Sequence, residues 1–232
     1  MSKEREMVEI IPTCVPQSAD DISKTSELIQ TFTKQIHIDI ADGIFAPSHT
    51  WPYTEHGTFE KFDLSAALDL QKEVHLMVEE PRQIGIEAAR AGAFRIIGHA
   101  EAFSSESEAH GALDAWRRAG AKEVGLGLLL DTPFELIEHH VHILNVVHLM
   151  SIATIGKQGI SYDERAPERI AQFHERFPDI LISVDGGVAE SNIQDLVRAG
   201  ARRFGVGSAI SKAADPKGVY ERLKRLAQMS AL

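Results

Sequence analysis

The sequence contains a single cysteine, Cys14, so no disulfide can form within the chain. A lone thiol is typical of a reducing compartment, and we expect a cytoplasmic location. Long apolar runs are also missing: even residues 126–130 fall far short of the ~20 that a membrane helix needs. The charged start at residues 1–6 is followed by no apolar segment, which argues against a signal peptide. We therefore expect no membrane partner.

Basic residues are in short supply. The chain has 24 Lys and Arg against 34 Asp and Glu, for a formal net charge of -10. This excess argues against a nucleic-acid partner, because a nucleic-acid surface needs a basic patch. It leaves room for an anionic small molecule, since backbone N–H groups bind phosphate whatever the net charge.

Short β-branched runs alternate with amphipathic segments along the whole chain. Strands are predicted at residues 8–12, 35–40, 73–77, 94–98, 123–128, 144–150, 180–184 and 203–206. Helices are predicted at residues 19–32, 64–70, 82–91, 106–119, 133–139, 167–177, 190–199 and 216–229. Eight such units average about 29 residues each, which favours an α/β chain folded as a (β/α)8 TIM barrel. No linker divides the chain, so one domain over residues 1–232 is expected.

A repeated tripeptide supports this interpretation. Ala-Gly-Ala precedes a predicted strand at residues 91–93, 119–121 and 199–201. Glycine after a helix takes the left-handed conformation easily, so the repeat indicates a recurring helix-to-strand turn. A doubly wound open sheet is the alternative. It normally carries a glycine-rich fingerprint after the first strand, and Pro-Thr-Cys-Val-Pro at residues 12–16 is nothing like one.

Two histidines and two aspartates stand at the ends of predicted strands. His37 and Asp39 are two residues apart on one strand, so their side chains leave the same face. His75 and Asp185 end two other strands, and in a closed barrel all four would meet at the mouth. Two nitrogen and two oxygen donors suit a divalent metal ion such as Zn, Fe, Mn or Co. The alternative is that the histidines are core residues satisfied by neighbours and that Asp39 caps a helix.

Several motifs resemble those of the ribulose-phosphate 3-epimerase family. They are His-Ile-Asp-Ile-Ala-Asp-Gly at residues 37–43, Val-His-Leu-Met-Val at 74–78, His-Ala-Glu-Ala at 99–102, Val-Asp-Gly-Gly-Val at 184–188 and Gly-Ser-Ala-Ile at 207–210. The resemblance implies a metal-dependent barrel that inverts C3 of a ketopentose 5-phosphate, and a homo-oligomer. By resemblance the metal ligands would be His37, Asp39, His75 and Asp185. Asp39 and Asp185 would also be the catalytic acid/base pair.

The proposed chemistry explains why two carboxyl groups are needed. Epimerisation beside a ketone removes a weakly acidic proton and returns one to the opposite face of the carbon. Two groups flanking the sugar do this without rotating it. At rest one of Asp39 and Asp185 must be ionised and the other protonated, and the sequence leaves open which is which.

Glycine follows the seventh and eighth predicted strands, and the loop after the sixth carries glycine beside a lysine. In this fold such loops commonly bind phosphate, because glycine lets the backbone approach the oxygens. The alternatives are tight turns for the glycines and a solvated loop residue for the lysine. The candidate phosphate-binding residues are Gly186, Gly187, Gly207, Ser208, Gly156 and Lys157.

The predicted function is metal-dependent 3-epimerisation of a sugar phosphate, interconverting ribulose 5-phosphate and xylulose 5-phosphate. A ketohexose 6-phosphate of the allulose 6-phosphate type is the alternative substrate. The family usually carries Met where this chain has Ala41, which would leave more room beside the metal. Barrel decarboxylases and aldolase-like synthases tend to carry an Asp-x-Lys strand motif, whereas here Asp39 is followed two residues later by Ala41. The loop at residues 153–159 departs from the family pattern, which keeps open a sugar-phosphate-binding barrel without catalysis.

Four further histidines lie near Glu138 in the sequence. His139 and His140 end a predicted helix, where a positive imidazolium suits the helix dipole. For them and for His142 and His148 we expect a surface or interface role rather than a second metal site.

Overall fold

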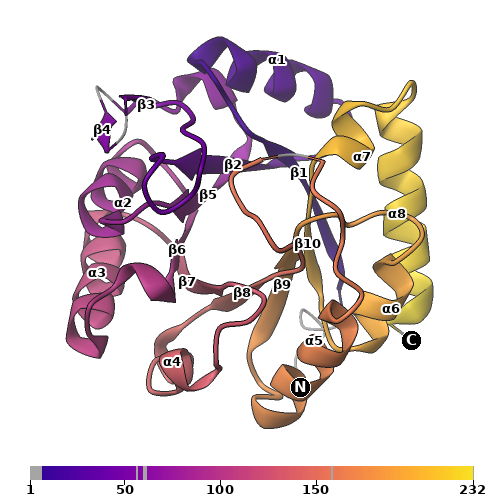
Figure 1. Ribbon diagram of the computed structural model, residues 1–232. Coiled ribbons are helices and arrows are strands. Elements are labelled where there is room, and N and C mark those ends of the chain that lie inside the picture. Colours follow the sequence, from indigo (N-terminus) through magenta and orange to yellow (C-terminus); the bar gives the residue numbers. More distant parts are fainter. Residues whose placement is uncertain (1–6, 56, 60–61, 158, 232) are drawn as a thin grey trace.

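The computed structural model describes residues 7–55, 57–59, 62–157 and 159–231, and the charged start at residues 1–6 lies outside this part of the chain. Within it, eight parallel strands close into a barrel in the order β1-β10-β9-β8-β7-β6-β5-β2, with helices outside (Figure 1). The predicted α/β class and (β/α)8 barrel are therefore confirmed. No helix among these residues is long and apolar enough to cross a membrane.

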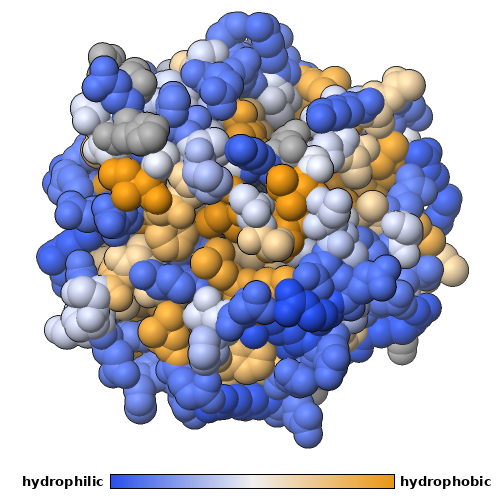
Figure 2. Space-filling view, viewed as in Figure 1, coloured by the Kyte–Doolittle hydropathy of each residue, from blue (hydrophilic) through white to orange (hydrophobic). Residues whose placement is uncertain are grey.

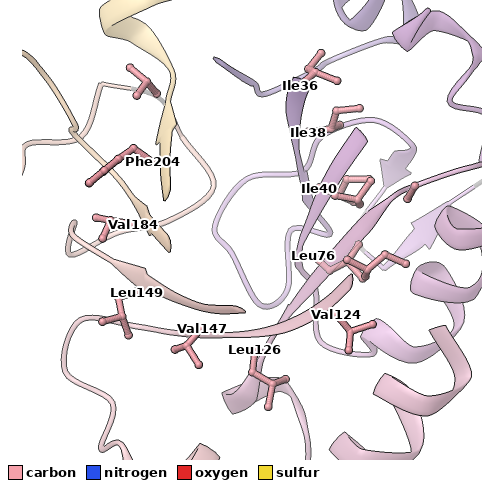
Figure 3. Close-up of a cluster of buried hydrophobic side chains, with 14 of the residues drawn as sticks. Ile36, Ile38, Ile40, Leu76, Val124, Leu126, Val147, Leu149, Val184 and Phe204 are labelled. Atoms are coloured by element: carbon pink, nitrogen blue, oxygen red, sulfur yellow. The ribbon is translucent and has the colours of Figure 1, made fainter. Parts of the chain in front are cut away.

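Each barrel strand overlaps a strand predicted from the sequence. The strands are β1 (Glu9–Cys14), β2 (Gln35–Ala41), β5 (Gln71–Met77), β6 (Arg95–His99), β7 (Glu123–Leu128), β8 (Val146–Met150), β9 (Leu181–Asp185) and β10 (Arg203–Val206). The apolar residues of these strands alternate with the site residues, as the two-residue period of a strand requires. On β2, for example, Ile36, Ile38 and Ile40 face outward into the main core (Figure 3).

The helices cover the outside of the barrel. They are α1 (Ala19–Ile29), α2 (Pro81–Arg90), α3 (Glu106–Ala119), α4 (Glu135–Glu138), α5 (Ala166–Arg176), α6 (Ile193–Arg198), α7 (Ser208–Ser211) and α8 (Pro216–Ser230). A capping box fixes the start of α1, because Ser18 accepts the N–H of Asp21 and the Asp21 carboxylate accepts the N–H of Ser18. The glycines of all three Ala-Gly-Ala repeats have positive φ, 90°, 131° and 118°, which confirms the predicted turns.

Two predicted helices are much shorter than expected. The segment at 64–70 forms only a single 3-10 turn, η2 (Ser65–Ala67), because Leu68 takes a φ of 50°, which no helix continues. The segment at 133–139 is reduced to α4 and is followed by a 3-10 turn, η4 (Val141–Ile143). A hairpin of β3 (Tyr53–Glu55) and β4 (Thr58–Phe59), the 3-10 turn η3 (Ala100–Ala102) and helix α7 were not predicted. All four are too short to show a hydrophobic period.

The interior of the barrel is unusually polar. Branched apolar residues normally fill a barrel of this kind. Here charged and imidazole side chains are buried inside, among them Glu73, Arg95, His99, His148 and Arg203. The apolar core lies instead between strands and helices, where Trp116 of α3 and Phe173 of α5 are fully buried. The interior is therefore available for chemistry.

Candidate active site

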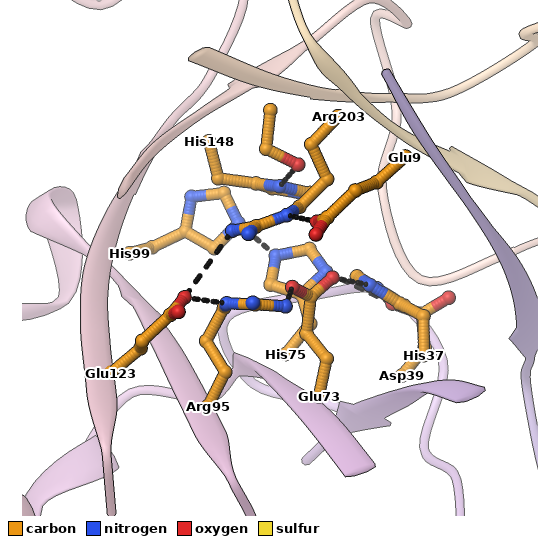
Figure 4. A network of polar contacts seen from close by, with 11 residues as sticks. Glu9, His37, Asp39, Glu73, His75, Arg95, His99, Glu123, His148 and Arg203 are labelled. Carbon is orange, nitrogen blue, oxygen red and sulfur yellow. Dashed lines mark hydrogen bonds and ion pairs between the residues drawn. The ribbon is translucent and has the colours of Figure 1, made fainter. Parts of the chain in front are cut away.

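The structure brings the four predicted metal ligands together. Donor atoms of His37, His75 and Asp185, together with one of His148, all lie within 4.8 Å of one another. Asp39 joins them, since its Oδ1 lies 3.0 Å from Nε2 of His37 and 2.9 Å from Nδ1 of His75 (Figure 4). Strand register produces the contact, because Asp39 on β2 is paired directly with His75 on β5.

These separations fit a divalent cation. Two donors about 2.1 Å from a metal and at right angles to each other lie about 3.0 Å apart, as the Asp39 contacts do. Burial lowers the pKa of the His75 imidazole, which keeps it neutral and able to donate a lone pair. In the part of the chain that the structure describes, this is the one group of histidine and acidic residues packed tightly enough to hold a metal ion. Its nitrogen and oxygen donors suit Zn, Fe, Mn or Co.

A buried ionic network supports the cluster from below. Nδ1 of His37 lies 2.5 Å from Oε1 of Glu73, whose other oxygen accepts from Arg95. Arg95 also donates to Glu123. Arg203 contacts Glu123 in turn and donates to the carboxylate of Glu9 on β1 (Figure 4). A carboxylate on the outer nitrogen of a histidine fixes the orientation and tautomer of the ring. The sequence analysis missed Glu73, although its place two residues before His75 puts it on the inward face.

His75 has a second support. Its Nε2 lies 2.9 Å from Nε2 of His99, and Nδ1 of His99 lies 3.3 Å from the carboxylate of Glu101. That carboxylate is itself held by the N–H of Leu129 at 2.7 Å and by the hydroxyl of Thr132. The ring of His75 is therefore fixed at both nitrogens.

The two predicted acid/base groups have opposite pKa shifts. Burial raises the pKa of Asp39, but the imidazoles of His37 and His75 outweigh burial and bring this pKa well below its usual range. Burial, and then the nearby charge of Asp39, raise the pKa of Asp185 to about 7. Such a divergence is what an acid and a base need in order to coexist at one pH.

A cavity opens above the cluster at the barrel mouth, and Asp39 and Asp185 both line it. The apolar side chains of Met77 and Met150 also line it. Figure 2 shows apolar residues gathered near the middle of this face, inside a hydrophilic rim. All six residues predicted to bind phosphate line the same cavity, namely Gly156, Lys157, Gly186, Gly187, Gly207 and Ser208.

Glycine is required at two of these positions. Gly186 and Gly187 have φ of 111° and 66°, a conformation that other residues rarely adopt. A Cβ at Gly186 would lie 2.7 Å from the side chain of Ile152, and one at Gly187 would lie 2.9 Å from Tyr162. The loop after β9 therefore presents bare backbone to the cavity.

The expectation that Ala41 leaves room beside the metal is wrong. Ala41 is fully buried and packs in a small apolar cluster with Ala46 and Ile155. It is not among the described residues that line the cavity. The loop after β8 fills the space, since it crosses the barrel mouth (Figure 1) and the hydroxyl of Ser48 donates to the carbonyl of Gly156.

The surface or interface role expected for the histidine group is wrong for two of its members. His148 is completely buried inside the barrel, and His140 is buried at 3% exposure. His139 is exposed, with 71% of its side chain accessible. His148 lies on β8 two residues before Met150, so both side chains leave the same, inward face of the strand. This two-residue period is the sequence signal that indicates a buried His148.

The fold and this mouth define a barrel enzyme with a carboxylate pair in a cluster that could hold a metal ion. Residues 12–211 match the model of the Ribulose-phosphate 3 epimerase family, and the chain belongs to that family. The predicted class, an isomerase of the epimerase type, is confirmed.

Known proteins agree with this assignment. The ribulose-phosphate 3-epimerase of Aquifex aeolicus (strain VF5) is 33% identical over 195 residues, which cover 82% of this chain and 83% of that protein. The enzyme of the same name from Mycobacterium leprae (strain TN) is 30% identical over 201 residues, 83% of each chain. The crystal structure of KGPDC from Streptococcus mutans has a TM-score of 0.69 and covers 96% of this chain and 98% of its own. Its 11% identity supports a shared fold alone.

Proposed function

We propose that the protein is a metal-dependent 3-epimerase that interconverts ribulose 5-phosphate and xylulose 5-phosphate. One observation carries the proposal: Asp39 and Asp185 belong to the cluster that could hold a metal ion, and both also line the cavity at the barrel mouth. A sugar in that cavity has a carboxyl group from β2 on one side and a carboxyl group from β9 on the other. Family membership supports the same reaction type.

The two carboxyl groups move the protons. With Asp39 ionised and Asp185 protonated, Asp39 removes the C3 proton and Asp185 delivers one to the opposite face. The reverse reaction needs the opposite protonation, so the roles exchange with direction. When bound by His37, Asp39, His75 and Asp185, a divalent cation supplies electrostatic stabilisation of the negative charge that develops on the sugar oxygens. Met77 and Met150 exclude water from the reacting carbon.

The phosphate lies at the glycine-rich side of the cavity in this proposal. Backbone N–H groups of Gly186, Gly187 and Gly207 donate to its oxygens, with the hydroxyl of Ser208 as a further donor. Lys157 is exposed at the cavity rim and supplies a mobile positive charge. Anchoring the phosphate there fixes C3 between the two carboxyl groups.

The closed space around Ala41 favours a pentose over a hexose. With the loop after β8 packed against Ala46 and Ala41, the sixth carbon of a ketohexose phosphate gains no room from the missing methionine side chain. The homo-oligomer implied by the family resemblance is a separate proposal, which light scattering of the purified protein would test.

Solvent exchange tests the function directly. In deuterated buffer, metal-loaded protein should replace the C3 hydrogen of ribulose 5-phosphate and form xylulose 5-phosphate, both visible by proton NMR. Asp39→Asn and Asp185→Asn should each slow exchange by about 10²- to 10⁴-fold, the usual contribution of a general acid or base. Asp195→Asn, an exposed carboxylate paired with Arg198 on α6, is the matched control and should exchange like the parent.

Two results would change the assignment. Binding of ribulose 5-phosphate without exchange at C3 would indicate a sugar-phosphate-binding barrel instead of an enzyme. Faster exchange into allulose 6-phosphate, run in parallel, would make the ketohexose phosphate the preferred substrate.

A further inference from the structure

His148 is a buried histidine that the proposed mechanism does not use. It lies on β8 with its side chain inside the barrel, and it is completely inaccessible to solvent. Nδ1 lies 3.0 Å from the hydroxyl oxygen of Ser183 on the neighbouring strand β9. Nε2 is buried and has no hydrogen-bond partner among the residues that the structure describes. One nitrogen is thus fixed and the other is free.

The free nitrogen has a specific environment. The ring centroid of His148 lies 4.6 Å from that of His75 and 5.6 Å from that of His37. One donor atom of His148 is within 4.8 Å of donor atoms of both these histidines and of Asp185. His148 is not among the described residues that line the cavity, so a bound sugar is not its partner. The cluster of metal donors is therefore the candidate partner of this ring.

The other histidines of the cluster differ from His148 in one respect. His37 has a carboxylate at each ring nitrogen, and His75 has a partner at each of its own. A buried imidazole nitrogen left without a partner destabilises the fold, and an apolar side chain of similar size would avoid that cost. Because His148 also belongs to the cluster of donor atoms, its unpartnered nitrogen indicates a ligand that the protein chain itself does not supply.

We propose that Nε2 of His148 is an additional ligand of the divalent cation, with the Nδ1–H donated to Ser183. This inference rests on the metal dependence in the proposed function and adds one imidazole to the four expected ligands. Ser183 fixes the tautomer, because a proton held on Nδ1 leaves the lone pair of Nε2 free to bind metal. A set of three imidazoles and two carboxylates favours zinc, iron or cobalt over manganese or magnesium.

X-ray absorption of the cobalt- or zinc-loaded protein, without substrate, counts the imidazoles around the metal. The expected count is three in the parent and two in His148→Leu, whose affinity for the metal should fall by more than about tenfold. Ser183→Ala should keep three imidazoles but bind the metal about 10- to 100-fold more weakly, as loss of a partner behind a ligand usually does. His140→Leu is the matched control, because His140 is also buried with both ring nitrogens unpartnered but lies next to the turn η4, outside the barrel. It should leave the count and the affinity unchanged.

The outcomes separate this inference from the proposed function. A parent protein that binds metal and epimerises ribulose 5-phosphate, but shows only two imidazoles, overturns the role of His148 and leaves the function intact. A parent that binds no divalent cation overturns both. If His148→Leu does not fold, the parent count and Ser183→Ala still decide the matter.

Discussion

The raised pKa of Asp185 has a consequence for stability that does not depend on activity. Its carboxyl has a pKa of 3.8 as the reference value and about 7 in the folded protein. Between these two values the folded chain binds more protons than the unfolded chain, so stability falls as pH rises. The contribution of this pKa shift to the unfolding free energy is fully present below pH 3.8 and is lost as pH rises through about 7. Asp185→Asn removes this titration.

The size of the effect follows from the same two values. The variant should gain about 2 kcal/mol of unfolding free energy relative to the parent between pH 5.5 and pH 8.5, from linkage alone. This is an upper figure, because the cavity leaves Asp185 partly open to solvent, which screens the interaction. A constant offset caused by the amide itself does not matter, since only the change with pH is compared.

Urea unfolding of both proteins, with a chelator present to keep the cluster free of metal, measures the difference. Asp195→Asn, with its side chain 61% exposed, is the control and should show an offset that stays flat over this pH range. An equally flat offset for Asp185→Asn would refute the raised pKa. An offset that shrinks as pH rises would refute the sign of the argument.

Three further predictions concern the network, the phosphate side and the mouth. Glu73→Gln should lower the unfolding free energy by about 3–5 kcal/mol in urea denaturation, because the buried guanidinium of Arg95 and the ring of His37 each lose a carboxylate partner. An unchanged unfolding midpoint would mean that the network adds nothing to stability. Lys157→Ala should raise KM for ribulose 5-phosphate by about tenfold or more with little change in kcat, as expected for loss of one charge-assisted contact of about 1.5–3 kcal/mol; equal kinetics would make Lys157 a solvated loop residue. Gly205→Ala should lower kcat by about 100-fold, since its Cβ would lie 2.9 Å from Oδ1 of Asp185 and displace that carboxyl. Gly111→Ala, where a Cβ meets nothing within 4 Å, is the matched control for that kinetic measurement.

The barrel could be predicted from the sequence because apolar strand-like runs alternate regularly with amphipathic segments along the whole chain. Each strand has an apolar run bounded by a turn, and the repeated Ala-Gly-Ala places a helix end before three of them. The mouth residues were predicted for a related reason. Asp39, His75 and Asp185 lie within the last three residues of their strands, which meet at one end of a parallel barrel, and His37 shares the inward face of β2 with Asp39. Topology alone therefore brings them close.

Residues in the middle of strands were harder to assign. His148 and Glu73 acquire their roles from partners on other strands, Ser183 and Arg95, which no local pattern in the sequence connects to them. Because His148 is near His142 in the sequence, it was also grouped with the histidines expected to lie at the surface or an interface. The packing of Ala41 was missed for a similar reason, because it depends on where the loop after β8 crosses the mouth.

The polar interior has an energetic basis that links fold and site. Apolar burial, at about 25 cal/mol per Å², stabilises the fold on the outer faces of the strands, where residues such as Ile38 and Leu76 pack under the helices. The inner faces are thus not needed for an apolar core. Charges placed there are costly unless each is paired, and Glu73, Arg95 and Arg203 each have an oppositely charged partner or an imidazole within the network. Because Glu73 also contacts His37, the pairing that makes a buried charge tolerable is the same contact that orients a candidate metal ligand. A substitution that breaks the contact between Glu73 and His37 would therefore change the orientation of this candidate metal ligand before it changed the barrel fold.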